Sequence, residues 1–314
     1  MTAELVAEPR NLCEAAKAIR KIEVLVNPLS GSVGSAAPQE AEQLLSEFGI
    51  DYNITVLESG EVPQQVKAAV EAAPDLVIVV AGDGTARAVA NLCGPEGPLV
   101  APLAGGTMNM LPHAIYGEVD WKQGLINALT EGEVATISGG EVDGRSFYVA
   151  AILGAPALFG YAREAAREHH FLQAMRYSRN AYAKVFSNKV KYSFDGSEPD
   201  KAEAVALLCP LVSKKMNDQR ALEAAAINPK GAADAFKLGV RTMLSNIAGD
   251  WRRDPNVTTA CIQSGRAWSS GSLPAILDGE PTKLHKVSDI RFRPNAFRVL
   301  APPSAPEPVN PVTG

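Results

Sequence analysis

The strongest constraint on the fold is a regular alternation of short apolar runs and helical stretches in the first third of the chain. The apolar runs lie at residues 21–27, 52–57, 76–81 and 98–103, and the helical stretches between them lie at 37–49, 61–73 and 85–93. Strands that alternate with helices of this length form a parallel sheet covered on both faces. The pattern therefore predicts an α/β domain with a doubly wound parallel sheet.

The pattern changes near residue 135, where β-rich stretches replace the alternation. We expect two helical insertions in this part, at about 158–187 and 232–248, the second because its apolar residues recur on one helical face. Residues 304–314 are rich in proline and predict a disordered tail or an extended strap. The expected parts are an α/β domain at 1–135, a mainly antiparallel β-sandwich domain at 136–303 and the tail at 304–314.

Composition excludes several classes of protein. The net charge of −5 and the pI of about 5.5 argue against a general nucleic-acid binder. The four cysteines lie far apart in the sequence, as expected of reduced thiols in the cytoplasm and not of a zinc site or a disulfide framework. No run approaches the roughly 18 apolar residues of a membrane span. The charged N-terminal residues lack the apolar centre of a signal peptide, so we expect a cytoplasmic protein.

Three glycine-bearing loops follow the first, third and fourth predicted strands. They read NPLSGS at 27–32, GDGT at 82–85 and AGGTMN at 104–109. In a parallel sheet these loops share one edge, where ligands bind beyond the carboxyl ends of the strands. Glycines let the backbone approach a ligand, and a following helix favours an anion with its free N–H groups. Together the loops predict a phosphate-binding cradle.

Asp83 stands between two of these glycines and has two interpretations. A carboxylate facing phosphates is favourable if a divalent cation lies between them, or if it accepts a proton from an attacking hydroxyl. Alternatively, Asp83 caps a helix that begins near Thr85. The P-loop and GxGxxG signatures are absent, so a P-loop ATPase and a standard dinucleotide-binding domain both lose support.

These three loops, in this order and spacing, resemble the catalytic domain shared by diacylglycerol kinases, sphingosine kinases and ceramide kinases, and most closely its soluble bacterial lipid-kinase branch. The far end of the chain agrees, because ILDGE at 276–280 and RFRPNAFRVLAPP at 291–303 resemble the closing motif and last strand of that family. Taken alone, the Asp-Gly pair of this motif is also a common hairpin turn.

The resemblance implies an NAD-kinase-like α/β domain and an ATP-dependent transfer of the γ-phosphate to a lipid hydroxyl, at a cleft between the two domains. It implies ATP and Mg²⁺ as cofactors, with Asp83 beside the metal and the transferred phosphate. Glu280, with Asp278 beside it, is the implied general base. The residues implied to bind the nucleotide are Asn27, Ser30, Gly31, Glu58, Ser59, Gly82, Gly84, Thr85, Gly106, Thr107 and Asn109.

The sequence departs from the family pattern at several positions. Arg87 and Ala88 replace a common Asn-Glu pair, and Met110 stands where diacylglycerol kinases carry an aspartate. Ser32 stands where some members carry a lysine, and Ser138 or Gly139 where bacterial members place a partner aspartate. These changes make a sphingoid base or ceramide a serious alternative to diacylglycerol as the substrate.

Residues 161–191 form a basic, aromatic-bearing segment. Seven cations stand against two glutamates, a net charge of +5 in a chain of −5. Such a stretch fits peripheral contact with an anionic membrane at its inner face, and it also fits a solvated helical face whose aromatic residues point to a core. A homodimer is also compatible with the sequence.

Two other functions remain open at this point. An NAD kinase shares a GGDGT-type loop and a related two-domain plan, but the second Asn-Glu motif of those enzymes is missing. A protein that binds nucleotide or lipid after losing catalysis would explain Arg87, Ala88 and Met110, although Asp83 and Glu280 are retained.

Overall fold

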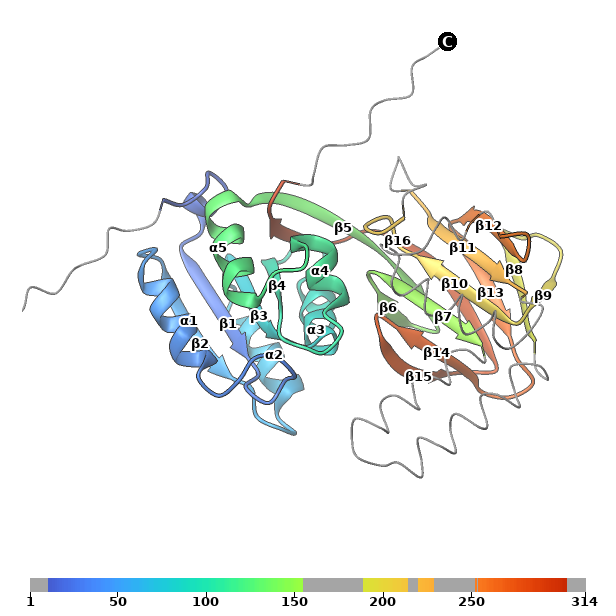
Figure 1. Cartoon of the computed structure of the whole chain (residues 1–314), viewed down its shortest axis with the longest axis horizontal. Helices are drawn as coiled ribbons and strands as arrows, with labels where there is room; N and C mark the ends of the chain where they lie inside the picture. Colours follow the sequence, from blue (N-terminus) through green and yellow to red (C-terminus); the bar gives the residue numbers. More distant parts are fainter. Residues whose placement is uncertain (1–10, 155–188, 214–219, 229–251, 253, 304–314) are drawn as a thin grey trace, which may run out of the picture. The chain divides into compact units, whose positions relative to one another are not determined.

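The computed structural model describes residues 11–154, 189–213, 220–228, 252 and 254–303 (Figure 1). The chain divides into two compact units. The first contains Met1–Ile137 and Asn295–Gly314, and the second contains Ser138–Pro294. The predicted helical insertions and the tail lie outside the described residues, as does the basic segment apart from its last three residues.

The first unit is built on a parallel sheet whose strands follow the order β2-β1-β3-β4. The strands are β1 (Lys21–Val26), β2 (Asp51–Val56), β3 (Leu76–Ala81) and β4 (Leu99–Ala104). The helices are α1 (Ala37–Ser46), α2 (Val62–Glu71), α3 (Asp83–Cys93), α4 (Met110–Tyr116) and α5 (Trp121–Glu131), after a short 3-10 turn, η1 (Ala16–Ala18). The α/β prediction is confirmed, with each predicted strand displaced by at most one residue.

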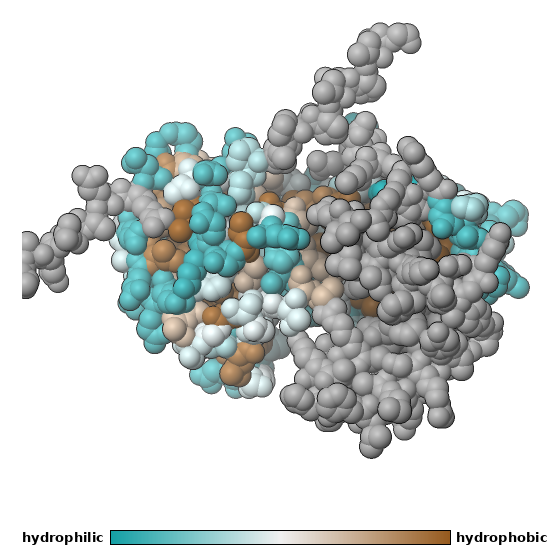
Figure 2. Space-filling view, viewed as in Figure 1, coloured by the Kyte–Doolittle hydropathy of each residue, from teal (hydrophilic) through white to brown (hydrophobic). Residues whose placement is uncertain are grey.

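Burial explains why these segments take these forms. Every residue of β3 and β4 is buried, as expected of strands covered on both faces. Helix α1 buries Ala37, Ala41 and Leu45 at a spacing of four residues, so one face packs on the sheet. Figure 2 shows a mostly hydrophilic visible surface over this unit, with scattered hydrophobic residues.

The strand order reverses direction between β1 and β3. The chain first moves outward from β1 to β2, then returns to the other side of β1 and continues through β3 to β4. Right-handed crossovers then place α1 on one face of the sheet and the next two helices on the other. The reversal makes the gap between the ends of β1 and β3 the switch point at which open α/β sheets bind ligands.

The second unit is a sandwich of two mainly antiparallel sheets. One sheet has the order β12-β11-β10-β7-β14-β15, and the other contains β5, β6, β8, β9, β13 and β16. Its strands are β5 (Glu133–Val142), β6 (Arg145–Phe147), β7 (Ala150–Gly154), β8 (Val190–Phe194), β9 (Asp200–Ala202), β10 (Ala204–Leu208), β11 (Leu222–Ile227), β12 (Val257–Ile262), β13 (Ser264–Trp268), β14 (Leu273–Leu277), β15 (Glu280–Leu284) and β16 (Val287–Ala301). Side chains from both sheets form one core, including Phe147, Tyr192 and Ile290 from one sheet and Leu153, Leu207 and Leu277 from the other.

The second domain boundary differs from the expected one. The division after Ile137 lies close to the predicted residue 135, but the chain returns to the first unit at Asn295 and not at a tail beyond 303. The physical reason is that β16 is one long strand. Its first part pairs with β13, whereas Val299 near its end pairs with Val100 of β4. No helix among the described residues is long and apolar enough to cross a membrane.

Candidate functional site

Three loops at the carboxyl ends of β1, β3 and β4 form the candidate site in the first unit. They comprise residues 27–32, 82–85 and 105–109, which we call the three-loop cradle. Strands β1, β3 and β4 are consecutive neighbours in the sheet, so their loops leave the same edge side by side. Two of the three loops flank the switch point between β1 and β3. The predicted gathering of these loops is therefore present in the fold.

The glycines are what allow the loops to touch. A Cβ atom on Gly106 would lie 2.8 Å from Cα of Gly82, closer than a side chain tolerates. A Cβ atom on Gly31 would lie 2.9 Å from Oγ1 of Thr107, and one on Gly82 would lie 3.5 Å from Oγ of Ser30. The third loop thus approaches the other two loops at backbone distance, and the Ser30 side chain lies against Gly82. Such packing brings backbone groups of separate loops within reach of a single ligand.

The first loop is shaped by its own polar groups. Asn27 accepts a hydrogen bond from the backbone N–H of Leu29 at 3.1 Å, which closes a tight turn. The Ser32 hydroxyl donates to the carbonyl oxygen of Gly106 at 3.2 Å and so joins the first loop to the third. The family pattern marks Ser32 only as a position where some members carry a lysine, and no local sequence signal predicts this contact.

The third loop is held by Asn109 at the start of α4. Its backbone is left-handed, with φ of 50°, and its side-chain oxygen accepts from the N–H of Gly106 at 2.6 Å. The residue is buried. Gly105, which is not among the residues predicted to form the site, is also required by packing, because a Cβ atom there would lie 2.6 Å from the backbone nitrogen of Ala81.

Asp83 is the first residue of α3, so the alternative interpretation, in which Asp83 caps a helix that starts near Thr85, does not hold. Gly82 occupies the N-cap position, with extended backbone angles, because the helix begins two residues earlier than expected. The Asp83 carboxylate instead accepts from the N–H of Leu111, in the first turn of α4, at 3.0 Å. The side chain is 7% exposed. A buried carboxylate therefore links the second loop to the start of α4, the helix that follows the third loop.

Glu58 and Ser59 follow β2, the strand at the outer side of β1. Both are exposed, and the backbone N–H of Glu58 donates to the side chain of Gln65 at 2.9 Å. They share the carboxyl edge of the sheet with the cradle, but the contacts that hold the cradle together do not involve them.

The late acidic motif forms a tight hairpin turn in the second unit. Leu277 pairs with Glu280, and the two residues between them, Asp278 and Gly279, both have positive φ. This is the two-residue turn that Asp-Gly sequences favour. Glu280 begins β15 and is partly exposed.

Asp278 is buried, with 1% of its surface exposed. Its carboxylate accepts three backbone N–H groups, from Tyr148 and Val149 at 2.8 Å and from Ala150 at 3.0 Å. This arrangement fixes the β14–β15 turn to the start of β7. Burial raises the pKa of the Tyr148 hydroxyl well above its ordinary value, and the Asp278 charge adds to that shift, so Tyr148 stays neutral.

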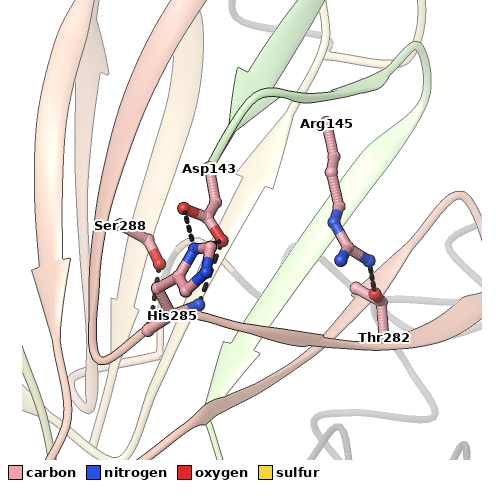
Figure 3. A network of polar contacts seen from close by, with 5 residues as sticks. All are labelled: Asp143, Arg145, Thr282, His285 and Ser288. Carbon is pink, nitrogen blue, oxygen red and sulfur yellow. Dashed lines mark hydrogen bonds and ion pairs between the residues drawn. The ribbon is translucent and has the colours of Figure 1, made fainter.

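A polar network ties β15, the strand that begins with Glu280, to the turn between β5 and β6 (Figure 3). His285 follows β15, and its Nδ1 lies 2.8 Å from the Asp143 carboxylate, which also accepts from the His285 backbone N–H at 3.0 Å. Arg145 donates to the Thr282 hydroxyl. Burial alone would raise the pKa of Asp143, but the hydrogen bonds and charge of His285 outweigh it, so the pKa is lowered.

The donor groups fit a nucleotide better than a free metal ion. Within the described ranges, no cluster of three or more His, Cys, Asp or Glu side chains is placed to hold a metal. One carboxylate, Asp83, lies in the cradle. Magnesium commonly binds through one or two carboxylates together with phosphate oxygens and water, so this donor set suits a metal that arrives with a phosphate ligand.

Comparison with known proteins agrees with this architecture. Residues 21–142, which include the whole cradle, match the sequence profile of the diacylglycerol kinase catalytic domain. A diacylglycerol kinase structure from the Sterne strain of Bacillus anthracis is similar at 17% identity, with a TM-score of 0.63 over 91% of this chain and 98% of that chain. No curated protein matches the sequence.

Two further solved structures from the same strain, provisionally assigned as diacylglycerol kinases, are also similar. One has 19% identity and a TM-score of 0.67, and the other has 18% identity and a TM-score of 0.64. Each comparison covers 91% of this chain and 99% of the other. The resemblance drawn from the motifs is confirmed, and so is the order of an α/β part followed by an antiparallel β part. The DGE motif lies outside the segment that the family profile matches.

Proposed function

We propose that this protein is an ATP-dependent lipid kinase that transfers the γ-phosphate of ATP to a lipid hydroxyl. The observation that carries the proposal is the meeting of three glycine-bearing loops at the switch point of the parallel sheet. The match of residues 21–142 to the diacylglycerol kinase catalytic domain supports it.

In this proposal the cradle binds the phosphates of the nucleotide. Helix α3 has Gly82 as its N-cap and Gly84 and Thr85 in its first turn. The free N–H groups and the positive dipole end at this N-terminus favour an anion. Gly31 and Gly106 keep the neighbouring loops close enough for their backbone groups to reach the same phosphate chain. The remaining proposed nucleotide contacts are Asn27, Ser30, Glu58, Ser59, Thr107 and Asn109.

Asp83 is proposed to hold Mg²⁺ together with the phosphate oxygens. The bound metal would supply charge neutralisation as the phosphoryl group is transferred. The protein's own contribution is to hold the Asp83 carboxylate in a fixed place, and the hydrogen bond from Leu111 does this.

Glu280 is proposed as the general base that accepts the proton of the lipid hydroxyl during attack on the γ-phosphate. Asp278 was expected to share this work, but three backbone hydrogen bonds occupy its carboxylate. We therefore assign Asp278 the task of positioning the turn that carries Glu280.

The substrate is proposed to be diacylglycerol or a sphingoid base or ceramide. The family profile favours diacylglycerol. The replacement of an aspartate by Met110 at the start of α4 favours the sphingolipid class, because that aspartate is typical of diacylglycerol kinases.

The decisive experiment is phosphate transfer from radiolabelled ATP to diacylglycerol, sphingosine and ceramide, each in mixed micelles with Mg²⁺. We expect one lipid class to be phosphorylated and the product to disappear when EDTA is added. The same preparation with NAD as the acceptor tests the alternative NAD kinase function. Binding of ATP without transfer to any acceptor would contradict the proposal and favour a binding protein that has lost catalysis.

A further inference from the structure

The outer face of one sheet in the second unit has an unusual composition. Strands β9, β8, β13 and β16 are consecutive neighbours in this sheet (Figure 1). Alternate residues such as Tyr192, Ala267 and Ile290 point into the sandwich core. The residues between them therefore point outward, because side chains alternate along a strand.

One row of outward residues crosses all four strands. Lys201 lies opposite Lys191, Lys191 opposite Trp268, and Trp268 opposite Val287. The Lys191 ammonium lies 5.8 Å from the centre of the Trp268 ring, a cation–π distance. Both lysines are exposed, Trp268 is partly exposed, and Val287 is 47% exposed. The row thus combines two cations with an aromatic ring and an exposed apolar side chain.

The rows beside it each carry one arginine and one acid, so the net positive charge of the face comes from the two lysines. Arg266 pairs with Asp289 at 2.7 Å. In the next row Arg291 lies opposite Ser264, whose hydroxyl donates to the Asp195 carboxylate at 3.0 Å. The face as a whole therefore carries four cations and two acids, a net charge of +2, on a chain whose total charge is −5. We call it the basic sheet face, and its residues are Lys191, Asp195, Lys201, Arg266, Trp268, Val287, Asp289 and Arg291.

We propose that the basic sheet face is the surface through which the protein docks on an anionic lipid bilayer. The choice of a lipid partner rests on the proposed function, since a lipid substrate must be reached at a membrane. Basic residues near the surface attract anionic headgroups, and a tryptophan suits the interface because its ring is apolar and its N–H is polar. The face belongs to described residues, whereas the basic segment proposed from the sequence lies mostly outside them.

A bilayer fits this face better than a duplex nucleic acid. Proteins that read duplex DNA insert a helix or a narrow ribbon into a groove. A broad sheet surface instead suits a plane of headgroups, and reversible docking follows because only a few charges and one aromatic side chain take part.

The test is co-sedimentation with vesicles of phosphatidylcholine, alone or with about one-third phosphatidylglycerol. The intact protein is expected to bind only the anionic vesicles, with binding that falls as salt rises. The double variant K191E/K201E should lower binding at least tenfold, and W268A at least threefold. A double variant that binds as well as the wild type would overturn the proposal.

The matched control is K17E/K67E, which makes the same charge change at exposed lysines of the first unit. It should bind within twofold of the wild type, and an equal loss would overturn the proposal because net charge alone would then explain binding. A wild-type protein that binds a duplex oligonucleotide through the same residues, but not anionic vesicles, would also overturn it. Vesicle binding needs no catalysis, so a failed kinase assay leaves this test unaffected.

Discussion

At the scale of single residues, the glycines of the cradle matter because they have no Cβ atom. Gly106 faces the backbone of Gly82, whereas Gly271 has open space around the position of a Cβ atom. The same chemical change, glycine to alanine, is therefore expected to have different results at the two positions.

We expect Gly106→Ala to lower the affinity for ATP at least tenfold, because the added methyl group would push the second and third loops apart. The same overpacking should lower the free energy of unfolding by about 1–3 kcal/mol. Isothermal titration with ATP and urea unfolding measure the two effects. Gly271→Ala is the control and should change neither. An unaltered ATP affinity in Gly106→Ala would mean that the cradle does not bind the nucleotide.

Glu280 and Asp278 are two residues apart in sequence but have different surroundings. We therefore expect a variant at Glu280 to lose activity and a variant at Asp278 to lose stability. Glu280→Gln removes the proposed base while keeping the shape of the side chain. We expect the rate of phosphate transfer to fall by roughly 100- to 10,000-fold, with ATP binding and stability retained. Steady-state kinetics with the lipid acceptor measure this, and full turnover by the variant would exclude Glu280 as the base.

Asp278→Ala is the contrast. It would leave three backbone N–H groups, two of them buried, without their acceptor, so we expect a loss of stability of about 2–4 kcal/mol, measured by urea unfolding. If instead the variant is as stable as the wild type and only turnover falls, Asp278 takes part in the chemistry and not in anchoring the turn.

At the scale of elements, the sequence predicted what depends on local pattern and missed what depends on distant partners. The apolar runs predicted β1, β2, β3 and β4 because burial on both faces leaves a local signature. That the three loops share one edge of the sheet followed from strand direction, whereas their lying side by side depends on the strand order. By contrast, the hydrogen bond from the N–H of Leu111 to Asp83 joins residues 28 positions apart in sequence, and no local sequence pattern predicts it.

The network around β15 gives a pH prediction at this scale. The folded-state pKa of Asp143 is lowered, so its ionised form stabilises the fold at pH values above the unfolded pKa, and this contribution is lost as the pH falls through the folded pKa. Asp143→Asn should therefore reduce stability by about 1 kcal/mol at neutral pH and by progressively less in acid. Asparagine tolerates the left-handed backbone at this turn, so the change keeps the turn while it removes the charge and replaces one of the two acceptor oxygens by a donor.

Urea unfolding of wild type and variant across the acidic range measures the pH dependence. His285→Gln serves as the second variant, because it removes the imidazole that contacts Asp143. In a His285→Gln background, the loss of stability caused by Asp143→Asn at neutral pH should be smaller than in the wild type. A stability gap between wild type and Asp143→Asn that stays constant down to low pH would contradict the assignment.

At the scale of the whole molecule, the two units are compact in space but not continuous in sequence. Strand β16 begins in the second unit and ends in the first, where Val299 pairs with Val100. The Tyr116 hydroxyl donates to the carbonyl oxygen of Leu300 at 2.6 Å. The sequence pattern placed the whole of 136–303 in one domain, because the residue pattern of a strand does not show that its two ends belong to different units.

This sharing predicts that residues 1–137 do not fold by themselves. Removal of the end of β16 would expose one side of β4 and delete two fully buried side chains, Val299 and Leu300. Each such side chain contributes about 2 kcal/mol by burial, a large part of the roughly 5–15 kcal/mol that stabilises a domain. Circular dichroism and urea unfolding should show a poorly structured fragment. The same fragment joined to residues 295–303 through a flexible glycine–serine linker should unfold cooperatively, because it regains the missing strand. A cooperative transition in the shorter fragment would show that the first unit does not need β16.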